Sequence, residues 1–136
     1  MSEFRFKYYR LTPEEKEILL KRVKRFLSGQ EDVLLAVVFG SFNELDSFRD
    51  LDVAVYLSKP SLNRVLQLAD ELEEEVGVPV DVVPLTELPP RFRHYVLVKG
   101  RVILEKRPGL YEALLSQTAD ELNLVERQTL KREKGR

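Results

Sequence analysis

The sequence predicts an α+β domain in which helices flank a small mixed β-sheet. The chain has 136 residues, the size of one ordinary domain. Segments with apolar residues at helical spacing alternate with short runs rich in valine and leucine, which are typical of buried strands. With 43% hydrophobic and 33% charged residues, the composition favours a folded protein. We expect one domain over residues 1–136, with about ten flexible N-terminal residues and a flexible tail from about residue 127.

The first helix is predicted to begin at Thr12. This residue can cap the helix, Pro13 suits its first position, and Glu15 completes a capping box. Apolar residues then recur at helical spacing as far as Gly29, which offers a stop. Residues 33–39 follow as an apolar run without alternation, which predicts a strand covered on both faces.

The rest of the chain continues the alternation of strands and helices. A second strand is predicted from about Asp52 to Leu57, and the most regular helical pattern follows from Leu62 to Val76, where Gly77 supplies the break. Further along we expect a strand over residues 78–83, one or two helical turns around 92–98, a short strand over 102–105, and a last helix from Leu110 to about Glu126.

The composition excludes several classes of protein. The longest apolar runs are about seven residues, whereas a membrane helix needs roughly 20, and the first ten residues lack the apolar core of a signal peptide. We therefore expect a cytoplasmic protein without a membrane segment. The absence of cysteine excludes disulfides, thiolate metal sites and cysteine nucleophiles, so any metal would be held mainly by oxygen ligands.

Three aspartates stand out at the predicted strands. Asp50 and Asp52 are one residue apart where the second strand begins, so their side chains point to the same face, roughly 6.5 to 7 Å apart along the chain. Asp81 lies alone among the valines of the third strand, and an unpaired buried carboxylate is costly without a cation or several donors. An isolated Asp-x-Asp is common in turns, but two such sites in one small domain favour a shared site for divalent metal ions.

A glycine and a serine end the first strand. At Gly40 the backbone can approach a ligand closely, and the following amides with the Ser41 hydroxyl can bind phosphate oxygens. A plain turn is the alternative for any lone Gly-Ser. Here the acidic pair follows nine residues after Ser41. Hydrogen-bond donors for phosphate oxygens beside metal ligands indicate a site for a nucleoside triphosphate with magnesium.

These motifs together resemble the nucleotidyltransferases of the DNA polymerase beta type, in particular the minimal nucleotidyltransferases that are antitoxin partners of HEPN-domain toxins. The chain has VVFGSF, DLDVAV and VDVV in the order of that family, and the resemblance covers roughly residues 15 to 125. The loop from Phe42 to Arg49 departs from the pattern, since it is about two residues shorter and lacks the Ala-Arg-Gly that often follows Gly-Ser.

The resemblance implies a polymerase-beta-type fold and a role for each residue of the motif. Asp50, Asp52 and Asp81 are expected to be catalytic and to bind two Mg²⁺ ions, while Gly40 and Ser41 are expected to hold the triphosphate of ATP. Arg49 is a further candidate for phosphate binding, although it is equally compatible with a surface role. AMP would pass to a protein hydroxyl, a tyrosine of a HEPN toxin encoded nearby, and the chain would act as an antitoxin.

Two other functions stay open at this point. The chain could be an inactive nucleotidyltransferase-fold module that neutralises its partner by docking alone. Nucleic-acid binding is the third possibility, through basic and aromatic residues near the N-terminus, among them Phe4, Arg5, Phe6, Lys7 and Tyr8. We do not expect this last function, because the formal net charge is only −1.

Overall fold

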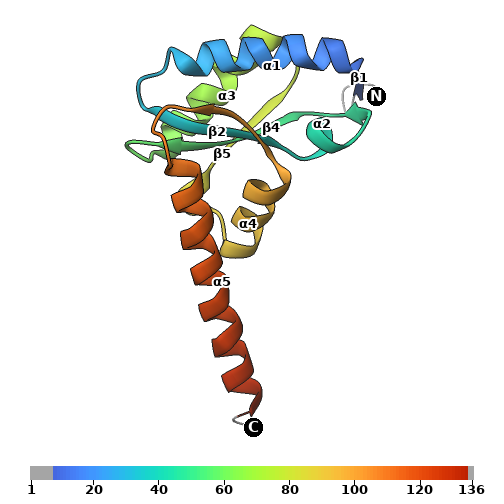
Figure 1. Ribbon diagram of the computed structural model, residues 1–136. Coiled ribbons are helices and arrows are strands. Elements are labelled where there is room, and N and C mark those ends of the chain that lie inside the picture. The colour runs from blue at the N-terminus through green and yellow to red at the C-terminus, as the bar shows by residue number, and fades with distance from the viewer. Residues whose placement is uncertain (1–7, 135–136) are drawn as a thin grey trace.

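The computed structural model describes residues 8–134, which form a four-stranded mixed sheet with helices on both faces (Figure 1). The elements in chain order are β1 (Tyr9–Arg10), α1 (Pro13–Ser28), β2 (Val33–Phe39), α2 (Ser41–Glu44), β3 (Ser47–Phe48), β4 (Leu51–Leu57), α3 (Leu62–Val76), β5 (Val80–Pro84), the 3₁₀ turn η2 (Leu85–Glu87), α4 (Pro90–Lys99), β6 (Arg101–Glu105) and α5 (Leu110–Lys134). The predicted α+β class is confirmed.

The strands of the main sheet follow the order β5-β4-β2-β6. β2 is antiparallel to both β4 and β6, whereas β4 and β5 run parallel, so the sheet is mixed as the sequence predicted. A crossover is needed between parallel strands, and α3 supplies it between β4 and β5. The nearly continuous apolar runs of β2 and β4 are buried because both faces of the sheet are covered.

Each face of the sheet has its own hydrophobic core. α1 and α3 cover one face, and the core there includes Val23, Leu68 and Val53. α4 and the first turns of α5 cover the other face, where the core includes Phe39, Ala54 and Leu97. Figure 1 shows the two helical layers on either side of the strands. Side chains that alternate along β2 and β4 therefore point to different helical layers.

The local signals of the first helix are present as predicted. The backbone N–H of Glu15 donates to the Thr12 hydroxyl at 3.1 Å, and the backbone N–H of Thr12 donates to the Glu15 carboxylate at 2.9 Å. Gly77 ends α3 in the left-handed conformation, with φ of 76°. Both helix boundaries follow from residues within one turn of the boundary itself.

One expectation about the chain ends is wrong within the described residues. α5 does not end near Glu126 but continues to Lys134, because residues 127–134 contain good helix formers and neither glycine nor proline. Basic residues in its last turn also suit the negative end of the helix dipole. At the other end, Tyr9 and Arg10 pair with β3 as a short antiparallel strand. The aromatic and basic residues before Tyr8 lie outside the described residues.

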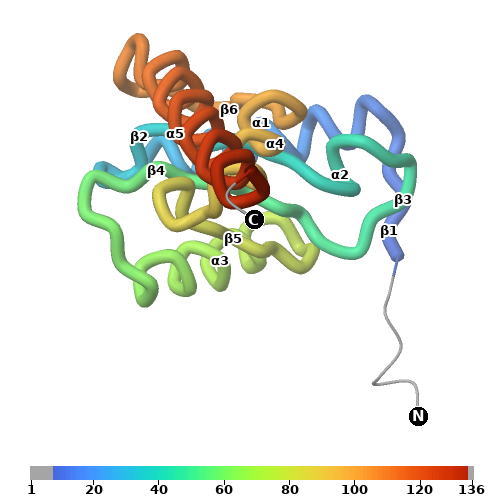
Figure 2. The backbone as a smooth tube through the Cα atoms, turned by 90° about the horizontal axis from the view of Figure 1, so that it is seen from below, coloured from blue at the N-terminus to red at the C-terminus, as the bar shows by residue number. Residues whose placement is uncertain are grey.

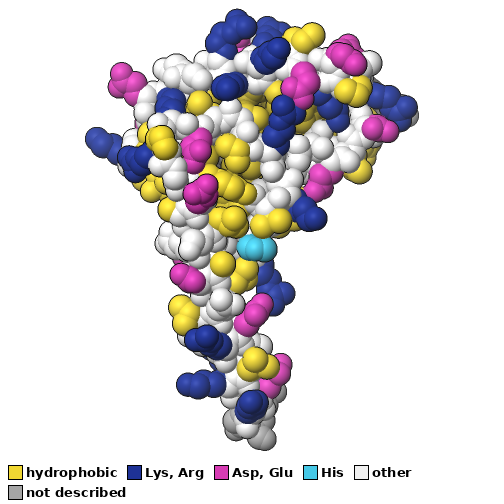
Figure 3. All heavy atoms as spheres, viewed as in Figure 1, with side chains coloured by type: hydrophobic (Ala, Val, Ile, Leu, Met, Phe, Trp, Pro, Cys, Tyr) yellow, Lys and Arg dark blue, Asp and Glu magenta, His cyan; other side chains and the backbone are white. Residues whose placement is uncertain are grey.

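Thr118 is the last buried residue of α5, and the C-terminal half of this helix projects from the body of the molecule (Figure 1). Figure 2 views the projecting helix nearly end-on. Its surface carries charged side chains of both signs with hydrophobic ones between them (Figure 3). Among the described residues, no helix is both long and apolar enough to cross a membrane.

Candidate active site

Two of the predicted carboxylates are neighbours across parallel strands. Asp52 of β4 is in register with Asp81 of β5, and adjacent strands lie about 4.8 Å apart. Asp52 lies two residues before the buried Ala54, so the two side chains point to the same face of the sheet. Both carboxylates therefore lie on the face that α4 covers. Asp52 is half-buried and Asp81 is exposed. The structure therefore brings together the two acids that the sequence placed on separate strands.

Asp50 adds a third negative charge to this pair. It is half-buried and precedes Asp52 by two residues. Burial, followed by the charges of Asp50 and Asp81, raises the pKa of Asp52 to about 7. Partial burial, followed by the charge of Asp50, raises the pKa of Asp81. Burial and like charge act in the same direction, so the three carboxylates form one electrostatically coupled cluster.

The Gly-Ser turn lies directly against this cluster. Gly40 has φ of 80°, a left-handed conformation that favours glycine, and a Cβ at this position would lie only 2.4 Å from Oδ2 of Asp52. Phe39, the residue before it, is paired with Asp52 across β2 and β4. A Cβ at Gly40 would force the Asp52 carboxylate to shift. Ser41 then begins the short helix α2, which the sequence analysis expected to be a loop.

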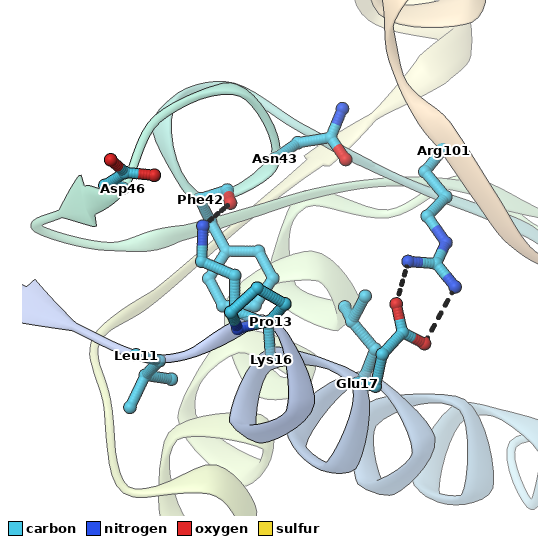
Figure 4. A pocket seen from close by; sticks show the side chains of 9 residues that line it. Leu11, Pro13, Lys16, Glu17, Phe42, Asn43, Asp46 and Arg101 are labelled. Atoms are coloured by element: carbon cyan, nitrogen blue, oxygen red, sulfur yellow. Dashed lines mark hydrogen bonds and ion pairs between the residues drawn. The ribbon is translucent and has the colours of Figure 1, made fainter.

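A lysine from α1 anchors α2 from the side. Its Nζ donates to the carbonyl oxygens of Phe42 at 2.7 Å and of Leu45 at 2.6 Å. The same ammonium lies 5.1 Å from the ring centroid of Phe42 and 5.9 Å from that of Phe48. Figure 4 shows this side chain, Lys16, reaching from α1 to the turn. Sequence reasoning missed Lys16, because its partners are more than 25 residues away along the chain.

Helix α4 borders the cluster with aromatic side chains. The hydroxyl of Tyr95 donates to the Glu44 carboxylate of α2 at 2.9 Å. Burial, the hydrogen bond to Glu44, and the charges of Glu44 and Asp52 all raise the pKa of Tyr95. The Phe92 ring stacks on Tyr95 and meets Phe39 edge-on. Nothing local in the sequence links Tyr95 of α4 to the acidic strands.

The carboxylates suit a hard cation but are not arranged as a finished metal site. Within residues 8–134, no group of three or more His, Cys, Asp and Glu side chains is placed to hold a metal ion. The donors at hand are all carboxylate oxygens, the ligands that Mg²⁺ takes in proteins. Their mutual repulsion around Asp52 would be relieved by a cation. Arg49, the remaining candidate, is exposed beside Asp50.

Solved structures share this fold. A chain from the complex of tri-AMPylated Shewanella oneidensis HEPN toxin with MNT antitoxin is 18% identical, with a TM-score of 0.69 over 89% of this chain and 99% of that chain. A toxin-antitoxin structure with AMP-PNP is 22% identical, with a TM-score of 0.65 over 92% of this chain and all of the other. The toxin-antitoxin MntA-HepT is 19% identical, with a TM-score of 0.63 and coverage of 92% and 100%.

Sequence comparison gives the family directly. No curated protein matches the chain at a significant level. The family described as polymerase beta, nucleotidyltransferase matches residues 21–108, a segment that includes the Gly-Ser turn and all three aspartates. This match spans more than half of the chain. On these grounds the chain belongs to the polymerase beta nucleotidyltransferase family.

Proposed function

We propose that this protein transfers AMP from ATP to a tyrosine hydroxyl of a HEPN toxin and thereby acts as its antitoxin. The observation that carries the proposal is the register of Asp52 with Asp81, with Asp50 and the Gly40 turn beside them. Two similar folds support the choice of reaction, since one comes from a complex with a tri-AMPylated HEPN toxin and another from a structure with AMP-PNP. We propose a cytoplasmic location, where ATP is available for this activity.

In the proposed site Asp50, Asp52 and Asp81 would hold Mg²⁺, which would supply positive charge to stabilise the phosphates and the attacking oxygen. Gly40 and Ser41 present backbone N–H groups and a hydroxyl to the phosphate oxygens, and the exposed Arg49 adds a cation. We infer that the whole arrangement acts as a single nucleotidyltransferase domain.

The transfer itself is a single displacement at the α-phosphorus. The tyrosine oxygen forms a bond to phosphorus, the bond to the bridging oxygen of pyrophosphate breaks, and pyrophosphate leaves with that electron pair. Asp81 holds the proton released by the hydroxyl. Asp81 is exposed, so a hydroxyl on a protein surface can reach its carboxylate and pass the proton to it. No covalent enzyme intermediate is required.

A docking module without catalysis is the second candidate function. The observation that favours it is the lack, within the described residues, of a carboxylate group already arranged for metal binding. Such a module would neutralise the toxin by contact alone, and the aspartates would serve only structure or nucleotide sensing.

ATP labelled at its α-phosphate separates the two candidates. The purified chain is mixed with Mg²⁺ and the HEPN protein encoded beside it, and label on the partner is followed together with toxin activity. The enzyme predicts label that disappears in Asp50→Asn and Asp52→Asn but persists in Asp46→Asn, a control at an exposed aspartate of the same loop. Neutralisation by Asp52→Asn without any label would instead establish the docking module.

A further inference from the structure

Three aromatic rings form a connected group at the edge of the carboxylate cluster. Phe92 of α4 meets Phe39 edge-on, with ring centroids 5.7 Å apart and an interplanar angle of 80°. Phe92 also stacks on Tyr95, with centroids 6.2 Å apart and an angle of 18°. Phe39 is buried, whereas Phe92 keeps 40% of its surface exposed. Its ring is thus held by two neighbours and still accessible from solvent.

The exposed ring of Phe92 is linked through its neighbours to the Gly40 turn and to helix α2 of the proposed nucleotide site. Phe39 precedes Gly40 and pairs with Asp52 across the strands. Phe92 therefore contacts the residue just before the Gly40-Ser41 turn. Tyr95 is fixed by its hydrogen bond to Glu44, at the end of the helix that Ser41 begins. The ring of Phe92 therefore lies on the side of the site that α4 borders, in contact with the residue that directly precedes Gly40.

Isolated apolar side chains on a surface are common and need no function. Phe92 differs from the exposed Val98 of the same helix because two ring contacts hold its orientation beside the acidic cluster. An aromatic face beside a phosphate site is the arrangement on which nucleobases stack, and stacking tolerates any base because every base has a π-face. Purines present the larger ring surface.

We propose that Phe92, supported by Phe39 and Tyr95, is the stacking platform for the base of the nucleotide substrate and favours purines over pyrimidines. This inference rests on the proposed function in one respect only, namely that the carboxylate site takes a nucleotide. The platform contacts the base and not the phosphates. Loss of the ring should therefore weaken ATP binding about 5- to 100-fold and leave binding of inorganic tripolyphosphate unchanged.

The test compares Phe92→Ala with Phe92→Tyr and with Val98→Ala, a truncation at an exposed position of the same helix. Dissociation constants for ATP, CTP and tripolyphosphate are measured by calorimetry in the presence of Mg²⁺. The platform predicts that Phe92→Ala weakens ATP binding more than CTP binding, that Phe92→Tyr restores it, and that Val98→Ala changes neither. Equal ATP affinity in the wild type and Phe92→Ala would overturn the proposal.

A fluorescent reporter gives a second measurement that does not depend on truncation. The chain contains no tryptophan, so Phe92→Trp introduces a single indole at the platform, and Val98→Trp introduces one away from it. ATP should quench the first indole and not the second, whereas tripolyphosphate should quench neither. Quenching of both indoles to the same degree, or of the first by tripolyphosphate, contradicts base stacking.

Failure of this proposal is distinct from failure of the transferase. AMP transfer by the wild type with normal ATP affinity in Phe92→Ala refutes the platform and leaves the transferase standing. Ring-dependent ATP binding without any transfer supports the platform and refutes the transferase. If Phe92→Ala loses binding of the HEPN partner while ATP affinity is unchanged, the ring belongs to a protein interface and the platform is refuted.

Discussion

Replacing Asp52 with asparagine should stabilise the metal-free protein at alkaline pH while abolishing transfer. The carboxyl of Asp52 titrates at about 7 in the folded protein, compared with 3.8 for an ordinary aspartate. Because the folded state holds this proton more tightly than the unfolded chain, ionisation of Asp52 opposes folding. The penalty is absent below about pH 4, grows between pH 4 and 7, and is complete above pH 7.

The size of the effect follows from the shift in pKa. A difference of roughly three units corresponds to at most about 4 kcal/mol. Asp52 is only half-buried, so solvent screening reduces this to about 1–2 kcal/mol of added stability in Asp52→Asn at pH 8. Mg²⁺ at ten times its dissociation constant should stabilise the wild type by about 1.4 kcal/mol and the variant much less.

Denaturant unfolding in EDTA, at intervals from pH 4 to 8.5, measures the difference in free energy between the two proteins. Asp70→Asn, at an exposed position on α3, is the matched control and should differ little from the wild type at any pH. The reasoning is refuted if Asp52→Asn is no more stable than the wild type at pH 8, or if its advantage is the same at pH 4.

Further variants probe the surroundings of the cluster. Gly40→Ala should lose about 1–3 kcal/mol of stability and at least tenfold in transfer rate, because its Cβ clashes with Asp52. Gly77 has a similar φ but open space where a Cβ would lie, so Gly77→Ala should lose only the stability that backbone strain costs. Equal losses of stability in Gly40→Ala and Gly77→Ala would contradict the clash. Lys16→Met should cost about 1–3 kcal/mol in denaturant unfolding and raise KM for ATP, because α2 loses its anchor; an unchanged KM would count against this. Arg93→Met should cost about 1–2 kcal/mol in thermal unfolding, since it breaks the ion pair between the buried Arg93 of α4 and the partly exposed Glu121 of α5, and no loss would show that the pair is dispensable.

Features that depend on neighbouring residues could be predicted from the sequence. The capping box at Thr12, the glycine stop at Gly77 and the apolar runs of β2 and β4 each act within a few residues, so their elements were predicted correctly. Alternation along a strand likewise placed Asp52 on the face opposite Val53. The end of α5 was wrong, because only the lack of a breaker, and no positive signal, decides how far that helix extends.

Contacts between distant segments were beyond sequence reasoning. Lys16 binds α2 across 26 residues, and Tyr95 binds Glu44 across 51. Neither pair has a local signature, because a lysine and a tyrosine on helices are ordinary surface or packing residues. The aromatic boundary of the site was missed for the same reason, whereas the roles of the three acids and the glycine turn were proposed from the sequence and stay a prediction.

The intact mass of the HEPN partner, after incubation with this protein, ATP and Mg²⁺, tests the shared carboxylate site most directly. Since Asp81 lies in register with Asp52, the account predicts that adenylate is added to a partner tyrosine by the wild type and by Asp46→Asn. No adenylate should be added to the partner by Asp81→Asn or by Asp52→Asn. Undiminished adenylation by Asp81→Asn would contradict the claim that the two strands build one active site.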